Sequence, residues 1–338
     1  MAKVWMMAAA LVGVLLSPAW GQEYQASFAQ ALDAARALGR VESLIIARDG
    51  EVAVAEHLLG GDLDDPVNIK SLSKVVISAL VGIAIDKEEL DGVDQRLVDL
   101  LPKAAERNDD SRIEAITLDN LLSMRAGLAG TSNANYGAWV ASRNWVDFAL
   151  ARDFIDAPGG RMIYSTGNTH LLSAILTEAT GRSTRDLAEA WLLDPLGARI
   201  GGWDRDPQGI YLGGNNLALS PRAVLALGEL YRNDGMHEGA QVLSPEWIAA
   251  SWTPQQRSRL SGEYYGYGWF LTEMAGYNVR YGWGFGGQML YVVKDLGLTV
   301  VMTADPTQPS AGDGYVRRLH GLVETEIIPA AEAARAAQ

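Results

Sequence analysis

The decisive stretch of this chain is Ser71-Leu72-Ser73-Lys74, which opens a mainly apolar run over residues 75–85. This run is predicted to form a buried helix, and Lys74 falls in its first turn. A cation there opposes the positive end of the helix dipole, and burial among apolar neighbours disfavours its charge further. A lysine driven towards its neutral form, three residues from a serine hydroxyl, is suited to act as the base for a serine nucleophile. The stretch therefore suggests catalysis.

The same residues also have a purely structural interpretation. Ser71 would then only cap the helix, and Lys74 would extend its ammonium group to solvent along its aliphatic stem. Ser71, Lys74 and Ser78 share one face of the predicted helix, and the other positions are mostly apolar. The local sequence leaves both interpretations open.

The N-terminal residues predict export. The chain has 338 residues, 48% of them hydrophobic, enough for one large domain or two smaller ones. Lys3 provides a short basic start, residues 4–16 are apolar, and Ala19 and Gly21 are small residues of the kind that precede a cleavage site. This pattern is typical of a secretory signal peptide over residues 1–21, and the apolar run is short for a membrane anchor. We expect a periplasmic or secreted bacterial protein with no stable membrane anchor.

Cysteine content and charge exclude several classes of protein. The chain contains no cysteine, which excludes disulfides, thiol catalysis and thiolate metal sites. Without Lys3, 27 basic and 41 acidic residues remain, a net charge of −14. A protein of this charge is a poor match for nucleic acid or for anionic membrane surfaces. We expect its partner to be a small-molecule substrate, and the sequence does not indicate an oligomeric state.

Strand patterns occur at both ends of the chain around a helical middle. A hairpin is predicted from residues 44–47 and 52–55 around Asp49-Gly50, and further strands are predicted at 265–271, 288–293 and 298–303. Helical patterns dominate from residue 70 to about residue 233, and the tail from Arg317 is predicted to be a helix. The predicted fold class is α/β of the α+β type. One antiparallel β-sheet, built from both chain ends, is flanked by helices and carries an inserted, mainly helical domain.

The predicted boundaries follow from this pattern. After the signal peptide, a single domain is expected over residues 22–338, with an α/β part at 22–65 and 245–338 and a mainly helical part at 66–244.

Two further segments are candidates for the site. Tyr164-Ser165-Thr166 precedes a predicted helix, where a phenol near a lysine cation would favour the phenolate and relay protons. The glycine-rich segment 282–288 leads into a strand, where a backbone N–H could face a developing oxyanion. Each also has a simpler interpretation, as a buried tyrosine and as a turn between two strands. There is no Gly-x-Ser-x-Gly elbow, no phosphate-binding loop, and no metal-ligand spacing among the four histidines.

These motifs, in this order, resemble the serine β-lactamase and penicillin-binding protein superfamily. The closest likeness is to its class C β-lactamase-like branch, which includes family VIII carboxylesterases, D-aminopeptidase-like enzymes and 6-aminohexanoate-dimer hydrolase. The matching segments are 68–74, 116–128 (with Ala126 in place of the family's serine), 164–166, 219–222, 227–231, 285–287 and 300–303. The resemblance implies a β-lactamase/transpeptidase-like fold.

The resemblance also implies a mechanism without a metal or organic cofactor. Ser71 would attack a carbonyl group, and Lys74 and Tyr164 would carry its proton and that of the leaving group. The backbone N–H groups of Ser71 and Gln288 would form the oxyanion hole. An acyl-enzyme would form on Ser71 and be released by water.

Two departures from the family pattern bear on the substrate. Thr166 stands where β-lactamases usually have asparagine, and Phe285 stands where they have a lysine that helps to hold the carboxylate of a β-lactam. Together with Gly286 and Gly287, these residues are expected to contact the substrate. The leading hypothesis is therefore an exported serine hydrolase that cleaves a carboxylic ester or amide through a Ser71 acyl-enzyme.

Two alternatives stay open. One is a β-lactamase or D-amino-acid-specific peptidase acting on cell-wall material. The other is a non-catalytic binding or regulatory homologue. The sequence does not place the loops that line the pocket, although residues 132–145 and 211–216 are candidates.

Overall fold

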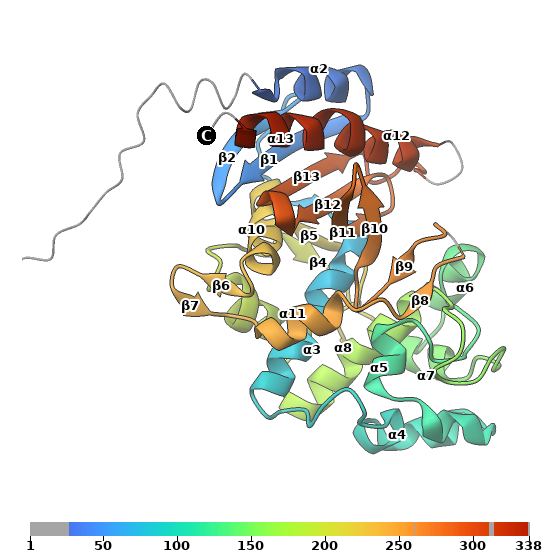
Figure 1. Cartoon of the computed structure of the whole chain (residues 1–338). Coiled ribbons are helices and arrows are strands. Elements are labelled where there is room, and N and C mark those ends of the chain that lie inside the picture. Colours follow the sequence, from blue (N-terminus) through green and yellow to red (C-terminus); the bar gives the residue numbers. More distant parts are fainter. Residues whose placement is uncertain (1–26, 260, 311–313, 337–338) are drawn as a thin grey trace, which may run out of the picture.

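A computed structural model describes residues 27–259, 261–310 and 314–336 (Figure 1). The predicted signal peptide lies outside these residues. Within the described part of the chain, eight strands form one antiparallel sheet in the order β2-β1-β13-β12-β11-β10-β9-β8. The strands are β1 (Val41–Arg48), β2 (Glu51–His57), β8 (Gln256–Arg257), β9 (Tyr264–Tyr265), β10 (Phe270–Met274), β11 (Tyr277–Gly284), β12 (Gln288–Val293) and β13 (Leu298–Ala304).

The two ends of the chain meet inside this sheet. Strand β1 lies between its hairpin partner β2 and the last strand, β13, with Ile45 opposite Val301. Successive residues of a strand face opposite sides of the sheet, so a continuous apolar run indicates burial on both faces. Leu44 and Ile46 accordingly join one core, while Ile45 joins the other. The predicted antiparallel sheet from both chain ends is confirmed.

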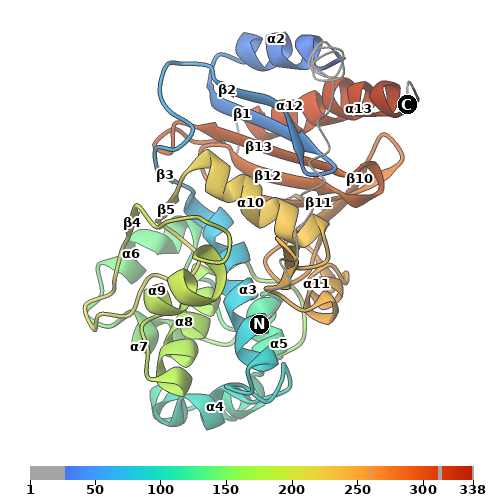
Figure 2. The same ribbon diagram turned by 90° about the vertical axis from the view of Figure 1, so that its left-hand side faces the viewer.

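Helices cover both faces of the sheet. Helices α2 (Ala29–Ala37), α12 (Tyr315–Leu322) and α13 (Ile328–Ala336) pack on one face, and α10 (Pro221–Arg232) crosses the other (Figure 2). The middle of the chain supplies the remaining helices, which lie beyond α10. These are α3 (Ser73–Asp86), α4 (Leu97–Leu100), α5 (Leu118–Leu122), α6 (Tyr136–Val140), α7 (Trp145–Leu150), α8 (Thr166–Thr180), α9 (Thr184–Leu187) and α11 (Pro245–Ser251).

Helix boundaries follow the signals in the sequence. Thr117 and Asn120 form a capping box at the start of α5. Helix α8 ends at Gly181, whose φ of +65° is a left-handed conformation that glycine adopts readily. The Ser220 side chain accepts the N–H of Ala223 at the start of α10. No helix in the described part of the chain combines the length and the apolar character needed to span a bilayer.

The structure corrects the prediction of a single strand over residues 265–271. The chain there leaves β9 at Tyr265 and enters β10 at Phe270, with a tight loop between them. Gly268 has a φ of +85°, and a Cβ atom on it would lie 2.9 Å from the carbonyl oxygen of Lys74. The loop therefore passes close to the first turn of α3, which a strand carrying side chains could not do.

The helical part also contains a three-stranded and a two-stranded antiparallel sheet. Strand β5 (Leu217–Leu219) lies between β3 (Val67–Asn68) and β4 (Gly202–Trp203), and β6 (Met236–His237) pairs with β7 (Ala240–Gln241). The pairing of β3 with β5 fixes the chain just before Ser71 against the segment that continues from Gly213. These two segments thus reach the same side of α3.

Candidate active site

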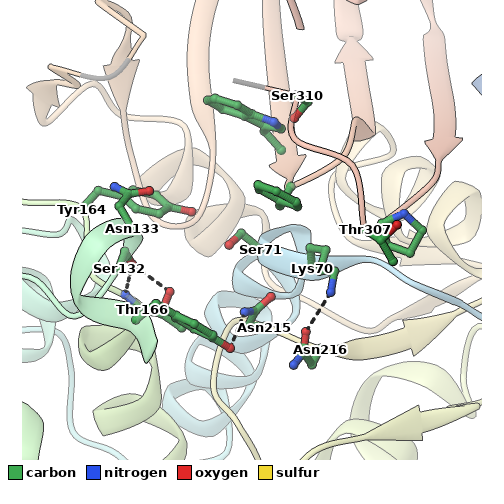
Figure 3. A pocket seen from close by; sticks show the side chains of 14 residues that line it. Lys70, Ser71, Ser132, Asn133, Tyr164, Thr166, Asn215, Asn216, Thr307 and Ser310 are labelled. Carbon is green, nitrogen blue, oxygen red and sulfur yellow. Dashed lines mark hydrogen bonds between the residues drawn. The ribbon is translucent and has the colours of Figure 1, made fainter. Parts of the chain in front are cut away.

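Ser71 lies in a cavity of about 510 Å³ where the sheet meets the helical part (Figure 3). It belongs to a short 3-10 turn, η1 (Lys70–Leu72), which leads directly into α3. Residues 73–84 of this helix are all buried, Lys74 among them with 1% of its surface exposed. The apolar run thus buries the helix inside the protein, and Ser71 lies just before its first residue, at the cavity.

Lys74 does not extend to solvent. Its Nζ lies 3.1 Å from Ser71 Oγ, 3.2 Å from Thr166 Oγ1 and 2.6 Å from the carbonyl oxygen of Gly214. Burial lowers the pKa of Lys74 to about 7, because a cation loses its hydration there and no carboxylate compensates it. A large share of Lys74 is therefore neutral at neutral pH.

The three contacts of Lys74 match the hydrogen-bonding capacity of a neutral amine, which has two N–H groups and one lone pair. The Gly214 carbonyl can only accept, so it takes one N–H. Thr166 Oγ1 can accept the second, which leaves the lone pair directed at the Ser71 hydroxyl. This arrangement can remove the Ser71 proton during attack on a carbonyl carbon.

Tyr164 stands beside this pair on the same cavity wall. Lys74 Nζ lies 5.0 Å from the centre of its ring. Burial raises the pKa of Tyr164 to about 12, and a hydrogen bond with Ser71 only partly opposes this. The expectation of a phenolate is therefore wrong for the free protein. Tyr164 keeps its proton and is placed to donate it rather than to act first as a base.

Thr166 is anchored by Ser132, a residue from a loop that sequence patterns could only suggest. The Ser132 hydroxyl lies 2.9 Å from Thr166 Oγ1 and accepts the Thr166 N–H at 2.8 Å. Ser132, Tyr136, Asn215 and Asn216 all line the cavity (Figure 3). Both candidate loops, 132–145 and 211–216, thus contribute to its wall.

The opposite wall comes from the glycine-rich segment 282–288, whose expected contacts with the substrate and the oxyanion stay predictions. Phe285 lines the cavity together with Trp283, but Gly286, Gly287 and Gln288 do not. A Cβ atom on Gly287 would meet Tyr315 of α12. The side chain of Gln288 is fully buried and pairs with the backbone of Ala304.

The backbone direction explains which residues of this segment line the cavity. The Gly284 carbonyl accepts the N–H of Gly287 at 3.2 Å, so it points towards the turn that leads to β12. Backbone groups of successive strand residues point to opposite edges, which directs those of Trp283 to the other edge of β11. Strand β10 pairs with β11 only up to Tyr281, so that edge is open beyond it. The edge of β11 that reaches the cavity is therefore the segment before Gly286.

A buried histidine–aspartate pair supports Lys74 from behind. His170 Nε2 lies 3.2 Å from Asp206 Oδ2, and His170 Nδ1 lies 3.3 Å from the N–H of Gly213. Because Nδ1 accepts that N–H, the ring proton resides on Nε2 and faces Asp206. Gly213 is joined to Gly214, whose carbonyl holds Lys74. No pattern in the sequence connects His170 with Lys74.

We expect His170→Phe to lower kcat by up to about a hundredfold, because small displacements of a base cost that much. The loop at Gly213 would lose its acceptor, and the acid limb of the pH–rate profile would move with the altered setting of Lys74. His170→Asn keeps an acceptor near the Nδ1 position and should retain most of the rate. Steady-state kinetics with a short-chain p-nitrophenyl ester measures both effects.

His320 offers the matched control. It is also a largely buried histidine, bonded to Tyr291 at 3.0 Å in the other core of the protein. His320→Phe should change stability without shifting the pH profile. An equal shift in the two phenylalanine variants would show that His170 has no positioning role.

Comparison with known proteins identifies relatives of this fold. A family model described as Beta-lactamase matches residues 28–323, which is most of the chain. No curated protein matches it. Among solved structures, the chain is similar to a protein named for 6-aminohexanoate-dimer hydrolase from Bacillus anthracis, with 18% identity, a TM-score of 0.71, and 88% of this chain and 80% of that chain covered.

Two further solved structures show the same likeness. A family VIII carboxylesterase is 18% identical with a TM-score of 0.70, and 88% of this chain and 96% of that chain are covered. A penicillin-binding protein homologue from Caulobacter crescentus is 17% identical with a TM-score of 0.72, and 92% of this chain and 98% of that chain are covered. At these identities the likeness concerns the fold.

Proposed function

The chain belongs to the beta-lactamase family, and on that premise we propose that it is an exported serine hydrolase that cleaves a carboxylic ester or amide. Ser71 forms the acyl-enzyme. The observation that carries the proposal is the contact of 3.1 Å between a buried, largely neutral Lys74 and the Ser71 hydroxyl. Lys74 has no nearby carboxylate and is directed at a serine in a cavity. A base in this position can activate the serine for acyl transfer.

The proposed reaction has two steps. Lys74 takes the Ser71 proton as Oγ bonds to the carbonyl carbon, and the backbone N–H groups of Ser71 and Phe285 stabilise the oxyanion. Phe285 replaces Gln288 in this role because it lines the cavity. The leaving group departs with a proton supplied through Tyr164, which Lys74 replenishes. Water then attacks the acyl-enzyme and regenerates Ser71.

The cavity wall favours esters and simple amides over β-lactams. Phe285 is 45% exposed and stands with Trp283 where a β-lactamase would present a lysine. Two apolar rings favour an apolar part of the substrate at this wall. No specific contact in the cavity favours the cell-wall peptide alternative or a non-catalytic role.

Export is the remaining part of the proposal. It rests on residues 1–21, which have the composition of a signal peptide. Expression of the full chain in a bacterial host should yield a mature protein in the periplasm or medium that begins at Gln22. Intact mass measurement of the fractionated protein tests this, and a cytoplasmic product that retains Met1 would contradict it.

A substrate panel tests the activity. The mature protein is assayed with p-nitrophenyl esters, the matching p-nitroanilides and a chromogenic cephalosporin, with Ser71→Ala as the blank. We expect turnover of esters to exceed that of the cephalosporin. Cephalosporin turnover as fast as ester turnover would favour the β-lactamase alternative. Failure of a fluorophosphonate probe to label Ser71 would favour the non-catalytic one.

A further inference from the structure

Lys70, the residue before Ser71, has an unusual backbone and an unusual position. Its φ is +51°, a left-handed conformation that non-glycine residues seldom adopt. The Asn68 side chain holds it there by accepting the Lys70 N–H at 2.9 Å. As a result, the Lys70 side chain lines the cavity on one side of Ser71, while Tyr164 lies on the other (Figure 3).

Lys70 is the one charged side chain among the 14 that line this cavity. Its Nζ has a long contact of 3.5 Å with Asn216 Oδ1, and it forms no ion pair with a carboxylate in the described part of the chain. An ammonium group has three N–H donors, so this contact leaves most of its capacity unused. Among the residues that the structure describes, this cation therefore has no direct counter-ion.

The surroundings of Lys70 keep the charge directed at the cavity. Asn216 donates its Nδ2 to Asp204 at 2.8 Å, and its Oδ1 accepts from Asn68 Nδ2 at 3.2 Å on the side that faces Lys70. The Asn216 amide thus lies between Asp204 and Lys70, and the Asp204 carboxylate acts on the Lys70 charge only at longer range. Burial lowers the pKa of Lys70, and Asp204 partly opposes the change. A partly desolvated cation of this kind gains most from an anion that enters the cavity.

We propose that Lys70 binds a carboxylate on the acyl part of the substrate, so that the preferred substrate is a half-ester or half-amide of a dicarboxylic acid. The acyl side follows from the geometry, because Tyr164 protonates the leaving group and Lys70 lies across Ser71 from it. A single ammonium among neutral amide groups matches a monoanion better than a phosphate dianion. This inference rests on the proposed hydrolase activity.

Two matched esters test the inference. Mono-p-nitrophenyl glutarate carries a carboxylate where p-nitrophenyl pentanoate carries a methyl group. We expect wild-type kcat/KM to favour the glutarate, and Lys70→Met to lower kcat/KM for the glutarate by about ten- to a hundredfold, as for a lost charge-assisted hydrogen bond. The pentanoate rate should change little. Lys70→Arg keeps the cation and should keep the preference.

Controls separate this inference from the proposed activity. Lys103→Met removes an exposed lysine and the same unit of charge, and should leave the preference intact. A wild-type protein without preference for the glutarate, or an equal loss on both esters in Lys70→Met, would overturn the role of Lys70 while hydrolysis itself stands. Hydrolysis of neither ester above the Ser71→Ala blank would instead overturn the proposed activity.

Discussion

Replacement of Ser71 by alanine lowers ester hydrolysis by more than about a thousandfold, the expected loss when the nucleophile of a serine hydrolase is removed. In the proposed reaction Ser71 Oγ forms the acyl bond, and the other hydroxyl near Lys74, Thr166 Oγ1, is held by Ser132. The variant should fold normally, because the alanine fills nearly the same space at the mouth of α3. Initial rates with a short-chain p-nitrophenyl ester, together with thermal unfolding, measure both properties.

A second readout identifies the acylated atom. A fluorophosphonate probe should add its mass to the wild-type peptide that contains Ser71 and to no peptide of the variant. Ser78→Ala is the matched control, because Ser78 is buried within α3, seven residues further along the chain, and does not line the cavity. Retained hydrolysis in Ser71→Ala, or an equal loss in Ser78→Ala, would refute the role of Ser71.

Local signals were sufficient for much of this fold. The hairpin of β1 and β2 forms as predicted, and the caps of α5, α8 and α10 likewise depend on residues close in sequence. The residue pattern did not predict β11, because the glycines at the end of this strand are typical of a turn. Its glycines are there because Leu72 and the Ile69 carbonyl press against Gly282 and Gly284. Close packing between segments that are distant in sequence cannot be predicted from the periodicity of apolar residues.

The site shows the same division. Ser71 and Lys74 are three residues apart, so their contact follows from helix geometry. The support of Lys74 by His170 and Asp206 could not be predicted, because it joins residues 36 positions apart. The protonation of Tyr164 could not be predicted either. A nearby lysine suggests a phenolate, whereas burial of both groups leaves a large share of the lysine neutral and keeps the phenol protonated. Burial is a tertiary property and reverses the local expectation.

Lys70 is a third case, because the sequence does not predict the direction in which its side chain points. A lysine before a helix is most often solvated, and Lys70 is not one of the residues that define the Ser71–Lys74 motif. Its left-handed backbone turns it into the cavity, and Asn68 and Asn216 hold that geometry. The apolar wall at Phe285 and the cation at Lys70 then divide the cavity into an apolar and a charged side.

The burial of Lys74 makes a second large effect predictable. Lys74→Met should abolish acylation of Ser71, because no other base contacts the hydroxyl. In the wild type, kcat/KM should rise with pH through about 7, since the neutral amine is the active form. Below that pH the rate should fall by about tenfold per unit. Lys74→Arg keeps a cation that cannot be deprotonated, so its inactivity would exclude a purely electrostatic role.

Stability provides an independent check on the same pKa. Lys74 binds its proton more weakly in the folded than in the unfolded protein, so the unfolded state holds more protons between about pH 7 and the ordinary lysine pKa of 10.5. The free energy of unfolding therefore rises with pH across this window. From about pH 7 to pH 9, the wild type should gain about 2 kcal/mol relative to Lys74→Met, as measured by urea unfolding. A constant difference would contradict the lowered pKa.

The absence of cysteine from the chain allows a direct test of the amine. Lys74→Cys introduces a single thiol, which 2-bromoethylamine alkylates in the unfolded protein to give a thioether analogue of lysine. The analogue restores an amine of nearly the same length, but its amine is less basic because sulfur withdraws electrons. Activity should return after refolding, with the acid limb of kcat/KM displaced to lower pH. Restored activity with an undisplaced limb would show that the titrating group is not Lys74 and that another residue takes the Ser71 proton.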